Sequence, residues 1–126
     1  MKYNFSDNEC LLMSLENQIV YAKYEVHTID ITIAQEATRL RIAFTKNQRL
    51  PVLTDISRVR RVTKEARQYF SSADSAVNVT ALAVLVEHPV TRAIFNFFLK
   101  FQQPRYPIKA FNDTSSAEKW LKQYVV

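Results

Sequence analysis

The sequence predicts a mixed α/β domain in which two antiparallel strands precede alternating helices and parallel strands. Two strand-like segments, 9–16 and 18–26, adjoin a polar turn near the N-terminus. Two later apolar runs, 50–55 and 79–87, are each followed by a segment with helical spacing, and parallel strands need crossovers of this kind. The predicted order is therefore β-β-α-β-α-β-α-β-α, with a mixed, mostly parallel five-stranded sheet and four helices in a single domain spanning 1–126.

Composition supports one domain and excludes two kinds of nucleotide site. The chain has 126 residues, 48% of them hydrophobic, which is enough for one sizeable core. It contains no glycine, so the phosphate-binding loops GxxxxGK[ST] and GxGxxG cannot occur in it. Turns that need a positive φ must fall to Asn and Asp instead.

The first two strands are predicted to form a hairpin. Side chains along 18–26 alternate in the way expected of a half-buried strand. Asn17 lies between the two segments and should take the positive φ that glycine would usually supply.

A helix is predicted after residue 30. Asp30 or Thr32 can cap its N-terminus, and Asn47 can close its C-terminus. Its inward residues recur at helical spacing: Ile33, Ala37, Leu40 and Phe44.

The strand at 50–55 leads through a basic turn into a second helix that begins near Thr63. The inner face of that helix should hold Val62, Ala66, Tyr69 and Phe70. The run at 79–87 is almost continuously apolar, which is typical of a central parallel strand covered on both faces. His88 and Pro89 end it, because proline disfavours a strand but fits the first turn of a helix.

The remaining segment is predicted to form a helix over 89–103, a strand over 106–111 and a closing helix over 113–125. Asp113 or Thr114 is the natural cap of the closing helix. Its inward residues should be Ala117, Trp120, Leu121 and Tyr124.

The segment DISRVRRVTKEA, 55–66, resembles the motif of STAS domains, the family of bacterial anti-sigma-factor antagonists. Those proteins carry D-[LIV]-S-x-V-x-x-[IV]-D-S-[ST]-G, and the chain matches its strand and turn positions at Asp55, Ile56, Ser57, Val59 and Val62. Asp30 also matches the Asp of the family's G-x-L-D pattern, with His27 in place of glycine. The resemblance covers essentially the whole chain as architecture, and it implies a SpoIIAA-like fold that acts through protein partners.

The resemblance implies that one family function has changed. In STAS proteins the first serine of DSSG opens the second helix and is phosphorylated by a partner kinase, whereas here Lys64 stands at that position. Lysine cannot become a phosphoserine, so we expect the phosphorylation switch to be lost. Thr63 is the adjacent hydroxyl, and we expect it to act as an N-cap rather than as a substitute acceptor.

A cluster of cations surrounds this turn and adds to a net charge of +5: Arg58, Arg60, Arg61, Lys64 and Arg67. One interpretation is a solvated loop and helix flank. The other is a site for an acidic partner or a phosphate-bearing ligand, where cations and the N–H groups of the helix start act together. The spacing leaves both open. No nucleic-acid-binding motif accompanies the charge, so no nucleic-acid partner is expected.

Catalytic and metal sites are weaker hypotheses. Asp55, Ser57 and His88 should meet at one rim of the sheet, where α/β proteins commonly bind ligands. Ser57 lacks the G-x-S-x-G elbow of a hydrolase, so Asp55 is expected to hold its own turn and His88 to cap or pack beside Pro89. Cys10, His27 and His88 are too scattered to predict a metal site.

The helix over 89–103 carries more apolar surface than one core contact requires. We expect its core face to hold Val90, Ala93, Ile94, Phe97, Phe98 and Phe101. Phe95 and Leu99 should project away from that face and need a second cover, either another loop or a partner such as a second copy of the chain. They are therefore candidates for self-association as a homodimer.

These observations predict a non-enzymatic regulatory or scaffold protein that acts by protein–protein interaction, with no cofactor. The alternative is a small-molecule or lipid-binding domain with an apolar pocket by the Phe-rich helix. We expect a cytoplasmic location, because the only cysteine, Cys10, has no disulfide partner, no apolar run is long enough to span a membrane, and the N-terminus lacks a signal-peptide layout.

Overall fold

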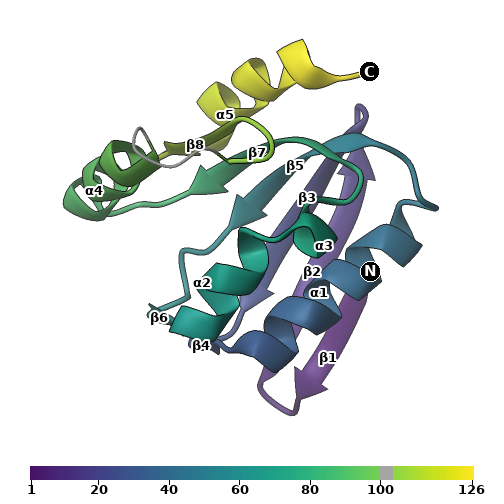
Figure 1. Ribbon diagram of the computed structural model, residues 1–126, viewed down its shortest axis with the longest axis vertical. Helices are drawn as coiled ribbons and strands as arrows, with labels where there is room; N and C mark the ends of the chain where they lie inside the picture. The colour runs from purple at the N-terminus through teal and green to yellow at the C-terminus, as the bar shows by residue number, and fades with distance from the viewer. Residues whose placement is uncertain (100–103) are drawn as a thin grey trace.

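The computed structural model describes residues 1–99 and 104–126. It contains a six-stranded sheet in the order β1-β2-β3-β5-β7-β8, with helices packed on both faces (Figure 1). The strands are β1 (Lys2–Ser6), β2 (Glu9–Glu16), β3 (Ile19–Glu25), β4 (Thr28–Ile29), β5 (Leu50–Asp55), β6 (Arg61–Val62), β7 (Val79–Leu85) and β8 (Ile108–Phe111). The helices are α1 (Ile31–Phe44), α2 (Lys64–Phe70), α3 (Ala73–Ala76), α4 (Pro89–Leu99), α5 (Thr114–Leu121) and the 3-10 turn η1 (Lys122–Tyr124).

The predicted class of sheet is confirmed, with more strands than expected. β1, β2 and β3 pair antiparallel, and β3, β5, β7 and β8 pair parallel. β1 was not predicted, because its KYNFS segment is short and has no buried residue. α3 was not predicted either, nor were the two-residue strands β4 and β6, which form a separate parallel pair.

Positive backbone angles fall mainly on asparagine, as the absence of glycine predicts. Asn17 has φ 52° at the β2–β3 hairpin, Asn47 has φ 63° after α1, and Asn78 has φ 64° before β7. Two other residues also adopt this conformation, Gln18 with φ 65° and Lys46 with φ 52°. Neither residue is an asparagine. At both positions the Cβ atom crowds the backbone, which makes the left-handed region costly.

One face of the N-terminal half of the sheet is covered by α1 and α2. Their inward residues pack on buried side chains of β2 and β3, including Leu11, Met13 and Ala22. Both helices begin at predicted caps: Asp30 accepts a hydrogen bond from the Ile33 N–H at 2.8 Å, and Thr63 caps α2. The buried side of α1 consists of Ala34, Ala37, Thr38 and Arg41, while Ile33, Leu40 and Phe44 are only partly buried.

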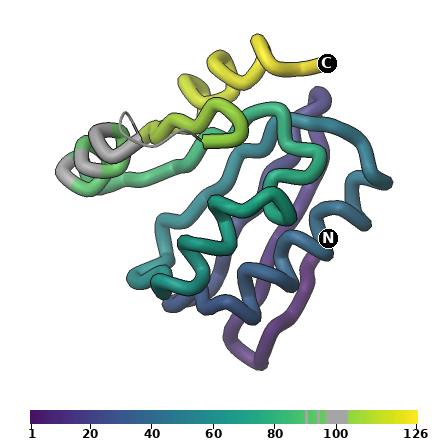
Figure 2. Tube along the Cα trace, viewed as in Figure 1, coloured from purple at the N-terminus to yellow at the C-terminus, as the bar shows by residue number. Residues whose placement is uncertain are grey.

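The opposite face is covered by α5. Ala117 and Leu121 are fully buried against Leu53, Ala81 and Ala83 from β5 and β7. As predicted, Asp113 caps α5 by accepting a hydrogen bond from the Ser116 N–H at 2.7 Å. Figures 1 and 2 show α5 at the top of the view, apart from α1 and α2.

The predicted orientation of α4 is wrong at Ala93 and Phe95. Ala93 is exposed, whereas Phe95 packs against Val84, Val86 and Ala110 of the sheet end. Asn96 also faces β8, because its side-chain amide accepts from the Ala110 N–H at 2.9 Å and donates to the Ala110 carbonyl at 3.3 Å. These two bonds satisfy the backbone of an edge strand, and periodicity of apolar residues gives no sign of them.

The rest of the α4 prediction falls outside the described residues. This applies to the side chains of Val90, Ile94, Phe97, Phe98 and Leu99, and to the whole of Phe101. Among the helices that the structure does describe, none combines the length and the apolar character needed to cross a membrane.

Candidate functional site

The turn between β5 and α2 is held by backbone hydrogen bonds to His27, just before β4, and to Ile29 in β4. The His27 carbonyl accepts from the N–H groups of Arg60 and Arg61 at 2.8 and 3.1 Å, and the Ile29 carbonyl accepts from the Thr63 N–H at 3.0 Å. Asp55 accepts from the Ser57 N–H at 2.9 Å, which confirms its expected role within its own turn. The basic segment is therefore presented on a fixed backbone.

All five predicted cations of this basic turn are exposed: Arg58, Arg60, Arg61, Lys64 and Arg67. Two of them are engaged, since Arg58 pairs with Glu25 at 2.8 Å and Arg67 donates to the Val62 carbonyl at 2.7 Å. Within residues 1–99 and 104–126, no ion pair involves Arg60, Arg61 or Lys64. These three charges are the part of the cluster that the fold itself does not use.

Lys64, which the resemblance to STAS domains aligns with the phosphoacceptor serine, is the first residue of α2. The hydroxyl of the preceding Thr63 accepts a hydrogen bond from the Ala66 N–H at 3.2 Å, so Thr63 is the N-cap, as predicted. The helix start is thus satisfied by a threonine oxygen and followed directly by a cation.

The side chains considered for a hydrolase make local contacts instead. Ser57 and His88 follow neighbouring parallel strands, since Asp55 of β5 pairs with Leu85 of β7. His88 accepts a long hydrogen bond, 3.5 Å, from the Thr91 N–H through Nδ1, which is a helix-capping contact. In the described part of the chain no hydrogen bond joins Ser57 to His88.

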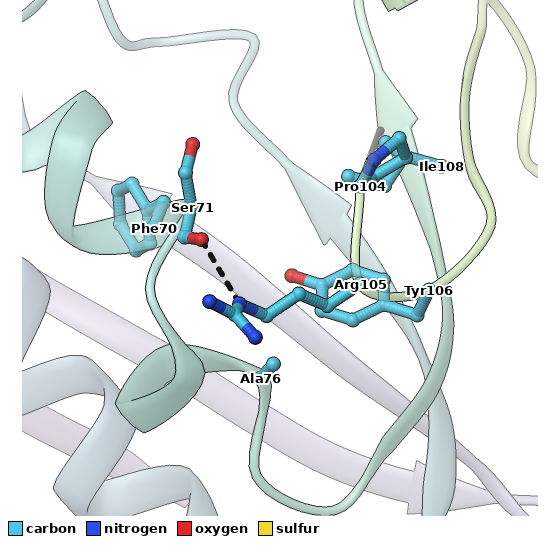
Figure 3. A pocket seen from close by; sticks show the side chains of 7 residues that line it. All are labelled: Phe70, Ser71, Ala76, Pro104, Arg105, Tyr106 and Ile108. Carbon is cyan, nitrogen blue, oxygen red and sulfur yellow. Dashed lines mark hydrogen bonds between the residues drawn. The ribbon is translucent and has the colours of Figure 1, made fainter. Parts of the chain in front are cut away.

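A cavity that no residue pattern in the sequence indicates lies on the face of the sheet that carries α2 and α3. Its volume is about 280 Å³, and its wall consists of Phe70, Ser71, Ala76, Pro104, Arg105, Tyr106 and Ile108. Figure 3 shows the Arg105 guanidinium beside Ser71, where Nε donates to the Ser71 carbonyl at 3.3 Å, with the Tyr106 ring close by. This cavity is mostly apolar, with one arginine at its exposed side.

A second, smaller cavity of about 70 Å³ lies between the sheet and α1. Phe70 and Tyr106 belong to the walls of both cavities, so they form the boundary between them. The polar members of the inner wall are Tyr24, Thr38, Arg41, Thr54, Ser75 and Tyr106.

Arg41 is the charged residue of this inner wall and is only 9% exposed. Its Nη1 donates to the Val77 carbonyl at 2.9 Å and its Nη2 to the Ser75 carbonyl at 3.0 Å. Burial lowers the pKa of Arg41, and burial also raises the pKa values of Tyr24 and Tyr106, so the cation sits among neutral hydroxyls. A signal for it existed, because Arg41 follows Ala34 and Ala37 at helical spacing.

The family model described as "Domain of unknown function (DUF7793)" matches residues 13–125. The chain belongs to the DUF7793 family. That match includes the basic turn, all residues of the outer cavity wall and all residues of the inner cavity wall except Leu11. None of the curated proteins matches the sequence.

The DUF7793 domain has a SpoIIAA-like fold. A solved structure similar to it is an uncharacterised protein of the DUF3478 family with a SpoIIAA-like fold from Shewanella loihica PV-4, with a TM-score of 0.66 over 94% of this chain and 99% of that one. The two sequences are 15% identical, so the likeness concerns the fold alone. It confirms the architecture that the STAS-like motif predicted, and leaves the roles of individual residues to their geometry.

Proposed function

We propose that this DUF7793 domain is a non-catalytic regulatory or scaffold module that binds an acidic protein partner through its basic turn. The observation that carries the proposal is the set of three exposed cations, Arg60, Arg61 and Lys64, which have no ion-pair partner in the described residues. Exposed charges on a fixed backbone attract a partner surface of opposite charge as it approaches, and they fix how the two surfaces align.

A constitutive interaction fits this site better than a phosphorylation switch. Lys64 places a permanent positive charge where a STAS phosphoserine would place a negative one, and the Thr63 oxygen is already the cap of α2. A partner that recognised this surface would therefore carry carboxylates and would not depend on a kinase.

Catalysis and self-association are not part of the proposal. Asp55 and His88 hold a turn and a helix start, which leaves Ser57 without an activating base. Phe95 packs against its own sheet, so the reason for expecting it at a homodimer contact is removed, and the side chain of Leu99 lies outside the described residues.

The proposal is tested with two triple charge reversals that change net charge equally. The test variant combines Arg60→Glu, Arg61→Glu and Lys64→Glu. The control combines Lys2→Glu, Lys119→Glu and Lys122→Glu, which are also exposed and lie on β1, α5 and η1. Partners captured and cross-linked by the wild-type chain are identified, purified and titrated against all three proteins.

We expect the identified partner to bind the wild type and the control alike. It should bind the basic-turn variant at least about tenfold more weakly, and the wild-type affinity should fall with added salt. A partner that binds the basic-turn variant as tightly as the wild type would contradict the proposal. An equal loss in both variants would reduce the effect to net charge and would contradict it too.

A further inference from the structure

Arg41 is a buried cation whose charge the described structure does not balance. Its two hydrogen-bond acceptors, the carbonyls of Ser75 and Val77, are neutral. No carboxylate forms an ion pair with it within residues 1–99 and 104–126. Burying a charge without a counter-charge costs desolvation free energy. An anion bound beside the guanidinium would offset that cost, so the site favours an anion.

The guanidinium retains donors for such an anion. It has five N–H groups in a planar fork, and the two carbonyl contacts account for two of them. The hydroxyl-bearing side chains of Tyr24, Thr38 and Tyr106 line the same cavity as the guanidinium. These groups converge on the inner cavity of about 70 Å³, which suits a small head group.

The adjoining outer cavity has a different chemistry. It is about four times larger, about 280 Å³ against about 70 Å³, and Phe70, Ala76, Pro104 and Ile108 make its wall mostly apolar. Ligand pockets typically combine a mostly apolar wall with a few convergent polar groups, which is the division between these two neighbouring spaces.

We propose that the two cavities together form a binding site for a small organic anion with an apolar body. The anionic head lies beside Arg41, Tyr24 and Tyr106, and the apolar body passes Phe70 into the outer cavity. The site is separate from the basic turn, so it does not depend on the proposed protein interaction. A carboxylate and a phosphate monoester share this head-group chemistry.

A purely structural role for Arg41 is the competing explanation. Its two carbonyl contacts join α1 to the segment that ends α3, which by itself would explain an arginine at this place in the fold. If Arg41 is purely structural, no anionic probe should bind. Filling the outer cavity would then have no binding to reduce. The two explanations therefore differ in a binding measurement.

The experiment is a calorimetric titration of the full chain after extraction of any carried ligand. The probes are octanoate and octyl phosphate, with octanol and octylamine as matched controls that keep the apolar body and change the head. We expect saturable one-to-one binding of at least one anionic probe, and binding of both controls at least about tenfold weaker, because each loses a charge-assisted hydrogen bond. The tighter of octanoate and octyl phosphate identifies the head group.

Three variants complete the test. Arg41→Gln should weaken the anionic probe at least about tenfold. Because that change can also affect folding, Ala76→Phe fills the outer cavity without touching Arg41 and should abolish binding. Ala73→Phe makes the same change on the exposed side of α3 and should leave affinity unchanged.

Three results would overturn the inference. The first is that neither octanoate nor octyl phosphate binds to the wild type. The second is that octanol binds as tightly as the better anion. The third is that a folded Ala76→Phe protein retains wild-type affinity.

Discussion

At most of the described helix starts, one side chain accepts a hydrogen bond from a backbone N–H group of the first turn. Asp30, Thr63 and Asp113 each accept a hydrogen bond from the N–H three residues later. Such caps satisfy donors that have no partner inside the helix. At Thr63 the same atom also bears on function, because an oxygen that caps α2 is the hydroxyl nearest the STAS phosphoacceptor position.

The cap at Thr63 can be tested by removing its oxygen. Thr63→Ala should lower the free energy of unfolding by about 1 kcal/mol, the usual cost of losing an N-cap. Thr63→Ser keeps the oxygen and should remain within a few tenths of a kcal/mol of the wild type. Denaturant unfolding of the three proteins measures this, and equal stability of the alanine and wild-type proteins would show that the cap contributes nothing.

Because the chain has no glycine, its tight turns place other residues at positive φ. The β2–β3 hairpin has positive φ at both central residues, Asn17 and Gln18. Two-residue hairpin turns of this kind favour Asn followed by Gly. Gln18 therefore occupies the position at which glycine, which has no Cβ, is preferred. The hairpin therefore stores a backbone cost that its packing offsets.

Relief of that cost should stabilise the hairpin. Gln18→Gly should raise the free energy of unfolding by up to about 1.5 kcal/mol, because a left-handed non-glycine residue costs about 1–2 kcal/mol and the added flexibility of glycine costs about 0.5–1 kcal/mol. Gln18→Ala keeps the Cβ and should bring no gain. Thermal and denaturant unfolding compare the variants, and a Gln18→Gly protein less stable than the wild type would refute this account.

At the scale of the whole molecule, the buried polar side chains of the described residues are concentrated on one side of the sheet. Tyr24, Arg41 and Tyr106 line the inner cavity under α1. The opposite face, under α5, is apolar, with Tyr21 donating to Glu118 at its margin. The face under α5 thus forms an apolar core, whereas the face under α1 holds the polar groups that can contact a ligand.

Burial of Tyr24 makes global stability sensitive to alkaline pH. Burial raises its folded-state pKa above the ordinary value of 10.0, so its contribution to stability is fully present below pH 10.0 and is lost as pH rises above that value toward the folded pKa. One proton changes the free energy of unfolding by at most about 1.4 kcal/mol per pH unit.

Tyr24→Phe should therefore reduce the loss of stability above pH 10.0 by up to that slope. Burial likewise raises the pKa values of Tyr21 and Tyr106, so part of the alkaline loss should remain. Denaturant unfolding at neutral and alkaline pH gives the comparison for each protein. Parallel pH profiles for the wild type and Tyr24→Phe would exclude Tyr24 as a source of the loss.

The sequence by itself determined the order of the main elements, their caps and the basic turn. Alternation and helical spacing report burial of apolar side chains, and caps depend on residues only three positions apart, so these features are local. Asn17, Asp30 and Thr63 could be placed from neighbours alone. The motif at 55–66 added the fold family for the same reason, since its residues are contiguous.

Only the tertiary structure decided which way α4 faces, where β1 pairs and what surrounds Arg41. The side chain of Asn96 packs toward β8 because it satisfies the backbone of Ala110, a partner 14 residues away, and no periodicity of apolar residues encodes that bond. The environment of Arg41 combines α1 with carbonyls 34 and 36 residues later and with a loop near Tyr106. A cavity is a space between elements distant in sequence, so its existence depends on how closely they pack.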